Sequence, residues 1–204
     1  MITSCDHQHA RQLEAAVRAD KDVYCEKPIA KTLDELNRCY DAVKESGKVV
    51  QVGTQVRSFP SILGCRTVYE TGVLGKVSRV EQRRNAKQPY WYMYINKDVK
   101  REDVNWDEFV MGRSRRSFDP VAYSAWLGYR DFSDGPIVQL AVHFLDTVNF
   151  ITGAELPESC VSLGGIYTWK DAHRFEVPDQ VQAIWTYPEG FMVSYSSNFG
   201  NAND

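Results

Sequence analysis

The sequence predicts an α/β segment followed by an α+β segment with a mostly antiparallel sheet. Helix-like and strand-like stretches alternate over the first 53 residues, with short connections, which is typical of parallel α/β architecture. A long aromatic stretch with little periodicity follows, from Tyr90 to Trp126. Residues 181–197 then alternate apolar and polar side chains with a turn in the middle, as two antiparallel strands do.

The composition is that of an ordinary globular protein. Of the 204 residues, 43% are hydrophobic and 25% are charged, and the formal net charge is -3. These values argue against disorder and against a nucleic-acid partner. No apolar run is long enough for a membrane span. The five cysteines are an odd number without a Cys-x-x-Cys pair, which favours free thiols in a cytoplasmic compartment and no metal site.

The first elements read as helix, strand, helix, strand. Residues 7–19 place Leu13 and Val17 on one apolar stripe, and Asp6 stands where a helix N-cap is expected. Val23–Cys25 is short and apolar, like a buried strand.

A second helix is predicted from Thr32 to Gly47. Thr32 and Glu35 have the spacing of a capping box, and Gly47 suits the left-handed position that ends a helix. The next strand covers residues 49–53. The apolar stripe of the helix is expected to be Leu33, Leu36, Tyr40 and Val43.

The second half predicts a helix over 60–70, a strand over 77–84 and a helix over 136–151 that ends at Gly153. Two strands, 181–187 and 191–197, complete the pattern. The irregular stretch between the predicted strand and the last helix is long enough to be a functional or covering loop.

The carboxyl ends of the first two strands form the first candidate site, because ligands of parallel sheets lie at that edge. Glu26, Lys27 and Pro28 follow one strand, and Gly53 to Arg57 follow the next. A lysine in a cleft can hydrogen-bond a hydroxyl or a developing alkoxide, and burial can lower its pKa into a range useful for proton transfer. The alternative is a surface salt bridge followed by a strand-terminating proline.

The predicted helix over 136–151 carries the second candidate. Gln139, His143 and Asp146 fall on one narrow stripe, opposite the apolar residues. A histidine held on a rigid helix can exchange a proton near neutral pH. The alternative is that this stripe is simply the solvated face of the helix.

The segment from Ser4 to His9 is the third candidate. Free amides at a helix N-terminus could contact an anionic or polar ligand there, although a plain capping role for Ser4 or Asp6 is equally consistent with the sequence. His7 and His9 are two positions apart, so they do not share a helix face as a metal pair would.

Several common catalytic and nucleotide-binding motifs are absent from the sequence. The chain contains no Gly-x-Gly, Gly-x-Ser-x-Gly or His-Glu-x-x-His, so it carries no dinucleotide fingerprint, P-loop, nucleophile elbow or zinc-protease motif.

In combination, these motifs resemble the Gfo/Idh/MocA superfamily of NAD(P)-dependent oxidoreductases, which includes glucose-fructose oxidoreductase and inositol dehydrogenase. Ser4 to His9 stands at the family's Thr-Pro-x-x-x-His, and Glu26 to Pro28 matches Glu-Lys-Pro. Gly53 to Arg57 stands at Gly-x-Asn-x-Arg, and Gln139 to Asp146 at Asp-x-Gly-x-His-x-x-Asp. Four motifs in order carry the resemblance. The chain departs from them at Cys5, Gln55, Gln139 and Ala141.

The resemblance implies a site for NAD or NADP and for a sugar or polyol. Lys27 would lie beside the nicotinamide and hydrogen-bond the reacting oxygen, and His143 would be the acid/base on the substrate side, so both must face one crevice. The implied cofactor-side residues are Ser4, His7, His9, Glu26, Lys27, Pro28 and Gln55. The implied substrate-side residues are Arg57, Gln139 and Asp146.

The implied reaction is hydride transfer between the cofactor and a sugar-like CH–OH carbon. An NAD-dependent glycosidase that oxidises its sugar transiently is an alternative, and so is a non-catalytic sugar-binding relative, because Gln139 cannot take a proton as an aspartate can.

The family pattern also implies a domain organisation. Residues 1–56 would be the carboxyl-terminal part of a Rossmann domain, and 57–204 an α+β domain for substrate and oligomer contacts, truncated at its end. We expect this chain to be an internal fragment that lacks the glycine-rich turn and binds dinucleotide poorly. The intact protein is expected to be a homo-oligomer that pairs through the open face of its sheet.

Overall fold

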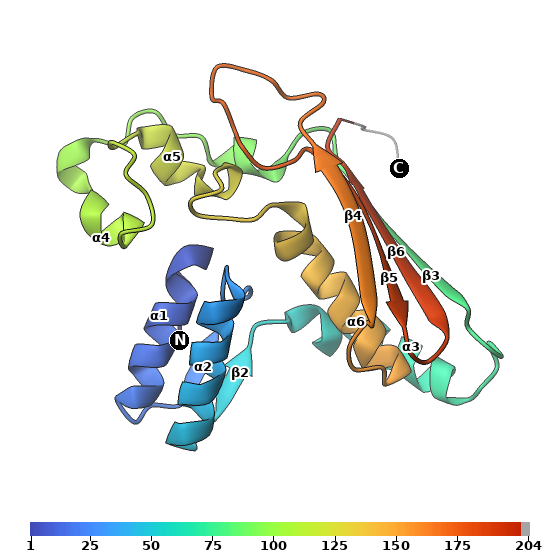
Figure 1. Cartoon of the computed structure of the whole chain (residues 1–204). Helices are drawn as coiled ribbons and strands as arrows, with labels where there is room; N and C mark the ends of the chain where they lie inside the picture. Colours follow the sequence, from blue (N-terminus) through green and yellow to red (C-terminus); the bar gives the residue numbers. More distant parts are fainter. Residues whose placement is uncertain (201–204) are drawn as a thin grey trace. The chain divides into compact units, whose positions relative to one another are not determined.

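The computed structural model describes residues 1–200 and divides into two compact units (Figure 1). Each unit collects segments that are distant in the sequence. The first unit contains Met1–Gly53, Tyr90–Val138 and Ala172–Val177, and the second contains Thr54–Pro89, Gln139–Asp171 and Pro178–Asp204. The boundary at residues 56 and 57 between a Rossmann part and an α+β domain stays a prediction.

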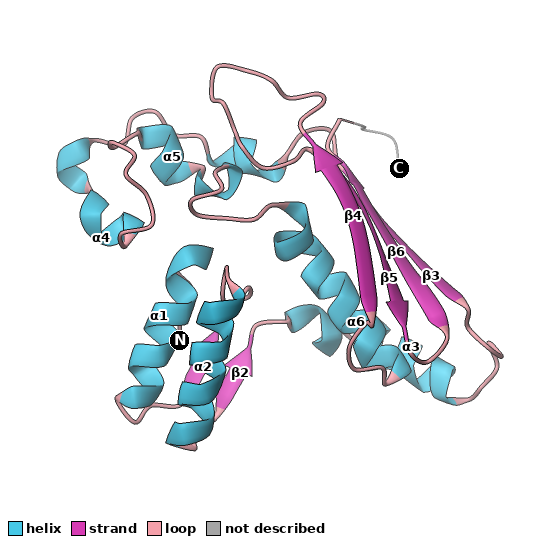
Figure 2. Cartoon of the chain, in the orientation of Figure 1, coloured by secondary structure: helices cyan, strands magenta, loops and turns pink. Residues whose placement is uncertain are grey.

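The first unit begins with the expected parallel α/β segment. Helix α1 (Asp6–Arg18) precedes β1 (Val23–Cys25), and α2 (Leu33–Ser46) precedes β2 (Val50–Val52) (Figure 2). The two strands are parallel, with Val23 opposite Val50. Ile2 adds a parallel bridge to Cys25 on the other side of β1. The predicted parallel architecture is therefore confirmed.

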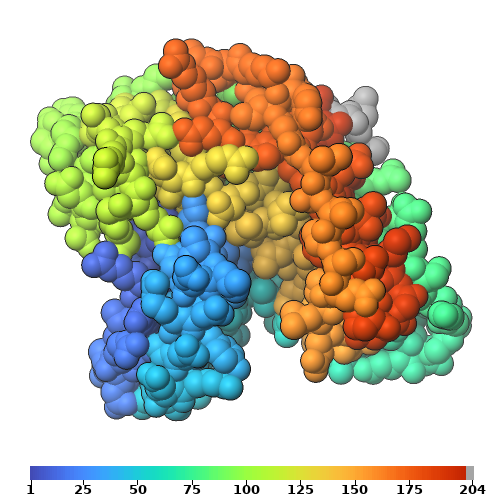
Figure 3. All heavy atoms as spheres, in the orientation of Figure 1, coloured from blue at the N-terminus to red at the C-terminus, as the bar shows by residue number. Residues whose placement is uncertain are grey.

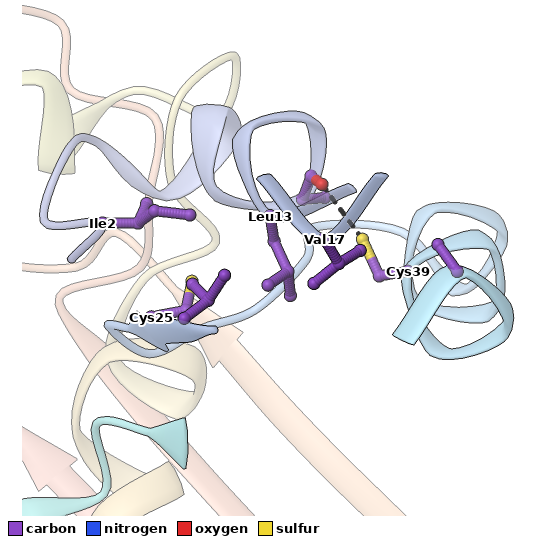
Figure 4. Packing of buried hydrophobic residues seen from close by; sticks show 8 residues of the cluster. Ile2, Leu13, Val17, Cys25 and Cys39 are labelled. Carbon is purple, nitrogen blue, oxygen red and sulfur yellow. Dashed lines mark hydrogen bonds between the residues drawn. The ribbon is translucent and has the colours of Figure 1, made fainter. Parts of the chain in front are cut away.

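A small apolar core holds these elements together (Figure 4). Leu13 and Val17 of α1 are each 1% exposed and pack over Cys25 of β1. Complete burial of a side chain of this size stabilises the fold by about 1.5–3 kcal/mol. Cys39 of α2 completes the cluster, and its thiol donates a hydrogen bond to the carbonyl of Ala10, with an Sγ–O distance of 3.1 Å.

The start of α1 differs from the prediction. Cys5 occupies the N-cap position and makes no side-chain cap, while Asp6 is the first helical residue and is buried. A carboxylate in the first turn is favourable even without capping geometry, because the helix N-terminus carries partial positive charge.

The predicted capping box at α2 is half correct. The Thr32 hydroxyl accepts a hydrogen bond from the amide of Glu35, with an N–O distance of 3.3 Å, and Gly47 ends the helix with a φ of 62°. The Glu35 carboxylate, however, pairs with the guanidinium of Arg113 rather than with the Thr32 amide. An ion pair with a distant arginine has replaced the local bond.

The predicted apolar stripe of α2 was wrong for three of its four residues, and only Val43 packs against the core. The buried residues of this helix are Cys39 and Ala42, whereas Leu33, Leu36 and Tyr40 are exposed. Small side chains let α2 lie close against α1, and this contact turns the leucines and the tyrosine outward. Figure 3 shows α2, in blue, at the surface of the first unit.

Residues 90–138 form a second, aromatic core in the first unit. Trp106 stacks on Phe109 with a centroid distance of 5.3 Å, and Phe109 meets Phe132 at 5.0 Å. Asn105 and Asp119 cap the two short α-helices of this stretch with their side-chain oxygens. Its elements are η2 (Tyr90–Tyr94), η3 (Arg101–Asp103), α4 (Trp106–Val110), α5 (Pro120–Ser124) and η4 (Trp126–Gly128).

The second unit is built on a four-stranded sheet with strand order β3-β6-β5-β4. Strand β5 runs antiparallel to both β4 and β6, whereas β3 is parallel to β6. The mostly antiparallel sheet is thus confirmed. The strands are β3 (Arg79–Asn85), β4 (Ser159–Gly165), β5 (Gln180–Tyr187) and β6 (Phe191–Asn198).

Helices cover one face of this sheet. Alternate residues of β5 and β6 are buried, as the two-residue period predicts, and Phe144 of α6 (Val142–Thr152) meets Tyr195 of β6 with a centroid distance of 5.8 Å. Helix α3 (Pro60–Glu70) packs beside α6. The 3-10 turn η1 (Gln55–Ser58) also contacts α6.

The helix predicted over 136–151 contains a π-helical turn, Ile137–Ala141, before α6 begins. A π turn adds a residue to the repeat and rotates the side chains that precede it. Gln139 lies within this turn and is buried rather than on a solvated stripe. Gly153 ends α6 with a φ of 78°, as predicted. Among residues 1–200, no helix combines the length and apolar character that a bilayer span requires.

Candidate active site

The carboxyl ends of the parallel strands align at one edge of the first unit. The amide of Glu26 donates to the carbonyl of Ile2, with an N–O distance of 3.0 Å, and the amide of Gly53 donates to the carbonyl of Cys25 at 2.8 Å. Ser4 and Lys27 come just beyond these bonds. The edge where parallel sheets bind ligands therefore carries two of the predicted residues.

Lys27 is the chemically informative group at this edge. Its side chain is half-buried, and burial lowers the pKa of the ammonium, while the carboxylates of Asp6 and Glu26 act in the opposite direction. Loss of water disfavours the charged form, which makes proton release easier. The peptide bond between Lys27 and Pro28 is cis.

Glu26 is positioned by its two neighbours. Its carboxylate accepts a hydrogen bond from the Tyr24 hydroxyl, with an O–O distance of 3.2 Å, and lies over Gly53. A Cβ at position 53 would stand 2.8 Å from the Glu26 carboxylate, so glycine leaves room for that group.

His9 is buried between two backbone carbonyls. Its Nδ1 lies 2.7 Å from the oxygen of Pro28, and its Nε2 lies 2.9 Å from the oxygen of Ser4. The Ser4 hydroxyl donates to Oε1 of Gln12 at 2.7 Å. The polar atoms of His9 and Ser4 are thus engaged within the protein, and their predicted cofactor contacts stay predictions.

His7 lies in the aromatic core. Its ring meets Phe132 with a centroid distance of 4.9 Å and Phe109 at 5.2 Å, and Nε2 donates to the carbonyl of Phe109 at 2.6 Å. Burial lowers the pKa of His7 from 6.5 to about 4, although the bond to Phe109 opposes the shift. The imidazole is therefore neutral at pH 7. A cofactor role for His7 also stays a prediction.

A pocket of about 550 Å³ opens beside the start of α1. Its lining combines aromatic rings with carboxylates and amides and includes no lysine or arginine. The density of Tyr and Trp in the sequence marked the aromatic stretch as a candidate functional loop. It did not identify the particular side chains that line this pocket. The lining residues are Thr3, Ser4, Cys5, Gln8, Asp103, Val104, Asn105, Glu108, Phe109, Tyr123, Ser124 and Trp126.

The second unit carries the other predicted residues. Arg57 of η1 binds the carboxylate of Asp146 on α6, with an Nε–Oδ2 distance of 2.8 Å, so these two side chains are brought together. His143 lies on α6 and is half-buried, and Gln55 is exposed. Lys27 belongs to the first unit and His143 to the second. Their meeting across one crevice stays a prediction.

Solved structures share this fold. The chain superposes on an aldose-aldose oxidoreductase from Caulobacter crescentus with a TM-score of 0.72 and 20% identity, covering 98% of this chain and 50% of that one. An NAD-binding protein from Listeria innocua gives a TM-score of 0.70 and 19% identity, covering 100% of this chain and 49% of that one. The chain thus spans about half the length of these proteins.

Curated relatives are more similar in sequence over shorter stretches. An inositol 2-dehydrogenase of Saccharopolyspora erythraea is 36% identical over 91 residues, covering 44% of this chain and 27% of the relative. A levoglucosan dehydrogenase of Pseudarthrobacter phenanthrenivorans is 36% identical over 76 residues, covering 37% and 20%.

Two family models cover most of the chain and coincide with the features described above. Residues 1–54, which hold the parallel strands and Lys27, match the oxidoreductase family with an NAD-binding Rossmann fold. Residues 108–204, which hold His143 and three strands of the mostly antiparallel sheet, match the GFO/IDH/MocA C-terminal domain. The chain therefore belongs to the Gfo/Idh/MocA family of NAD-binding oxidoreductases.

Proposed function

We propose that the whole protein transfers a hydride between NAD or NADP and a sugar-like CH–OH carbon, with Lys27 handling the proton of the substrate hydroxyl. The observation that carries this proposal is the place of Lys27, half-buried at the carboxyl end of a parallel strand with a lowered pKa. A structural lysine on a surface would have no reason to be desolvated there.

The pocket beside α1 fits part of a nicotinamide cofactor. The rings of Tyr123 and Trp126 suit a flat heterocycle, and the side chains of Asp103, Asn105 and Glu108 can accept hydrogen bonds from ribose hydroxyls. The lack of cations in the lining favours the neutral half of the cofactor over its phosphates. When bound, a nicotinamide supplies the hydride acceptor or donor.

The chain's own residues then divide the work. Lys27 Nζ would hydrogen-bond the reacting oxygen and accept or return its proton, and the nearby carboxylates of Asp6 and Glu26 would stabilise the ammonium form. His143 is proposed as the acid/base on the substrate side. Arg57, Gln139 and Asp146 are proposed to contact the substrate. The proposed cofactor-side residues are Ser4, His7, His9, Glu26, Pro28 and Gln55.

The names of relatives support a sugar or polyol as substrate. Inositol 2-dehydrogenase and levoglucosan dehydrogenase both act on polyhydroxylated rings by name. A second candidate has support as well, because a 2,7-anhydro-N-acetylneuraminate hydratase of Escherichia coli aligns over 81% of this chain at 23% identity. This relative favours a reaction without net oxidation, such as the glycosidase route in which the sugar is oxidised only transiently.

The test is turnover of the intact protein and of its Lys27→Ala variant with a panel of sugars and polyols. Loss of a positioned acid/base should reduce turnover roughly 100-fold or more, with cofactor affinity retained. Lys44→Ala, at an exposed position of α2, is the matched control. Net formation of reduced nicotinamide supports the dehydrogenase, and release of an aglycone without it supports the glycosidase. A wild-type protein that binds sugar but gives neither product is a binding relative.

Two further features are proposed for the intact protein. Val161, Leu163 and Ile184 are exposed on the sheet of the second unit, which supports pairing of sheets in a homo-oligomer. Sedimentation of the intact protein tests this. All five cysteines are free thiols, which supports a reducing, cytoplasmic compartment.

A further inference from the structure

The side chain of His9 joins two loops that the sequence keeps apart. One acceptor is the carbonyl of Ser4, in the loop that enters α1, and the other is the carbonyl of Pro28, in the loop that leaves β1. The distances of 2.9 and 2.7 Å are those of good hydrogen bonds. The ring is 1% exposed, so water does not compete for its nitrogens.

The chemistry of the two acceptors defines what the ring must do. A carbonyl oxygen only accepts, so a ring nitrogen bonds to it through an N–H group. Histidine places one ring nitrogen toward each of these two carbonyls, on opposite sides of the ring. A phenylalanine would fill the same space without either bond, and a glutamine could keep one of them.

The hydrogen bond from His9 to the Pro28 carbonyl lies next to Lys27 in the chain. Pro28 follows Lys27 directly, so a bond to its carbonyl restrains the backbone next to the proposed proton carrier. On the other side, the Glu26 carboxylate packs over Gly53, which has no side chain to displace it. Lys27 is thus flanked by one residue held through a hydrogen bond and one residue held through close packing.

We propose that His9 is a positioning residue of the active site, which cross-links the Ser4 and Pro28 loops and thereby fixes the direction of the Lys27 side chain. The proposal rests on the function proposed above for Lys27. It differs from a purely structural role, because a histidine that only fills the core would affect the stability of the whole unit and not the loop after β1 in particular.

The first test measures backbone amide hydrogen exchange in this chain. In His9→Phe, the amides of Lys27 and Ile29 should exchange roughly 10-fold faster while the amides of Leu13 and Val17 keep their protection. His9→Gln should give an intermediate increase. Cys39→Ala is the control, because it removes another side-chain bond to α1 at a distance from the loop. Unchanged exchange at Lys27 and Ile29 in His9→Phe would overturn the cross-link.

The second test measures kinetics in the intact enzyme. Misplacing Lys27 should lower kcat of His9→Phe roughly 10- to 100-fold, and His9→Gln should recover part of the loss. A wild-type enzyme that turns over and a His9→Phe variant with unaltered kcat would overturn the positioning role alone. A wild-type enzyme without turnover would instead overturn the proposed function, and the exchange result would still decide whether the cross-link exists.

Discussion

Asp146 on α6 holds the guanidinium of Arg57 through both of its carboxylate oxygens. Arg57 also lies over the ring of Phe150, with 5.5 Å between its guanidinium carbon and the ring centroid. Two of the three residues that were predicted to contact the substrate are therefore each other's partners. They fix η1 against α6. A substrate that bound the guanidinium or the carboxylate would have to compete with the ion pair between them.

This ion pair predicts a modest energetic coupling. Arg57 is 45% exposed and Asp146 only 12%, so solvent screens much of the attraction, and a double-mutant cycle of Arg57→Gln and Asp146→Asn should give about 0.5–1 kcal/mol. Arg57→Lys keeps the charge but loses the two-pronged geometry, and should recover less than half of that value. Urea unfolding at low and high salt is the measurement. A coupling that is absent at low salt would contradict the ion pair.

His7 should make the first unit sensitive to acid. Burial lowers the pKa of His7 to about 4 in the folded state. Between pH 6.5 and 4, His7 is therefore protonated in the unfolded chain and neutral in the folded chain. The stability is therefore complete above pH 6.5 and decreases as the pH falls toward 4, by at most about 3 kcal/mol.

His7→Phe tests this dependence, because Gln8 still donates to the Phe109 carbonyl, with an N–O distance of 3.1 Å. The free energy of unfolding, measured at several pH values, should decrease less in the variant than in the wild type. Parallel pH curves for the two proteins would show that His7 does not titrate in this range.

Gly128 should tolerate no side chain. A Cβ there would overlap the ring of Phe175, which is 7% exposed and packed against Trp91, Tyr92 and Tyr129. Gly128→Ala should therefore destabilise the protein by about 1–3 kcal/mol, through displaced aromatic side chains. Thermal unfolding and the near-ultraviolet circular dichroism of the aromatic core report the change.

Gly64 provides the matched control. It lies within α3, and no atom stands within 4 Å of where its Cβ would be. Gly64→Ala should raise stability by about 0.5–1 kcal/mol, because alanine loses less backbone entropy in a helix. Equal effects of the two substitutions would disprove the crowding at Gly128.

Asp179 should be essential for the stability of the second unit. Its carboxylate is buried and accepts hydrogen bonds from the amides of Tyr167, Thr168 and Trp169, with N–O distances of 3.0, 2.9 and 2.7 Å. Asp179→Ala leaves these amides without acceptors and should cost about 3 kcal/mol or more. Urea unfolding followed by tryptophan fluorescence measures the loss.

Asp179→Asn should be more stable than Asp179→Ala but less stable than the wild type. Its side-chain oxygen can still accept hydrogen bonds, whereas its NH₂ group would face a backbone N–H, and two donors cannot bond each other. Glu189→Ala, at an exposed position of the turn between β5 and β6, should change the free energy of unfolding by less than about 0.5 kcal/mol. An Asp179→Ala variant as stable as the wild type would mean that the three amides find other acceptors.

Local signals in the sequence predicted local structure correctly. The Thr32 cap, the glycine ends at Gly47 and Gly153, and the alternation along β5 and β6 all depend on residues within a few positions of each other. Such features need no knowledge of the rest of the fold.

Features that depend on distant partners were missed. Glu35 has local capping spacing, but its partner Arg113 comes from the aromatic stretch. Leu33 and Leu36 look like a core stripe, but the closest approach of α1 lies at the small residues Cys39 and Ala42. The lining of the pocket beside α1 likewise combines the start of the chain with residues 103–126. The motifs at Lys27 and Ser4 were visible in the sequence, whereas the engagement of His9 and His7 by backbone carbonyls was not.

The parallel pairing of β3 with β6 affects the order in which the protein folds during its synthesis. Arg79 lies opposite Met192, so β3 leaves the ribosome long before its neighbour in the sheet exists. Contacts between such remote segments slow folding, because a long loop must close first. The pairing of β1 with β2 needs only residues 23–52, whereas the sheet cannot form before residues 191–198 of β6 have been synthesised.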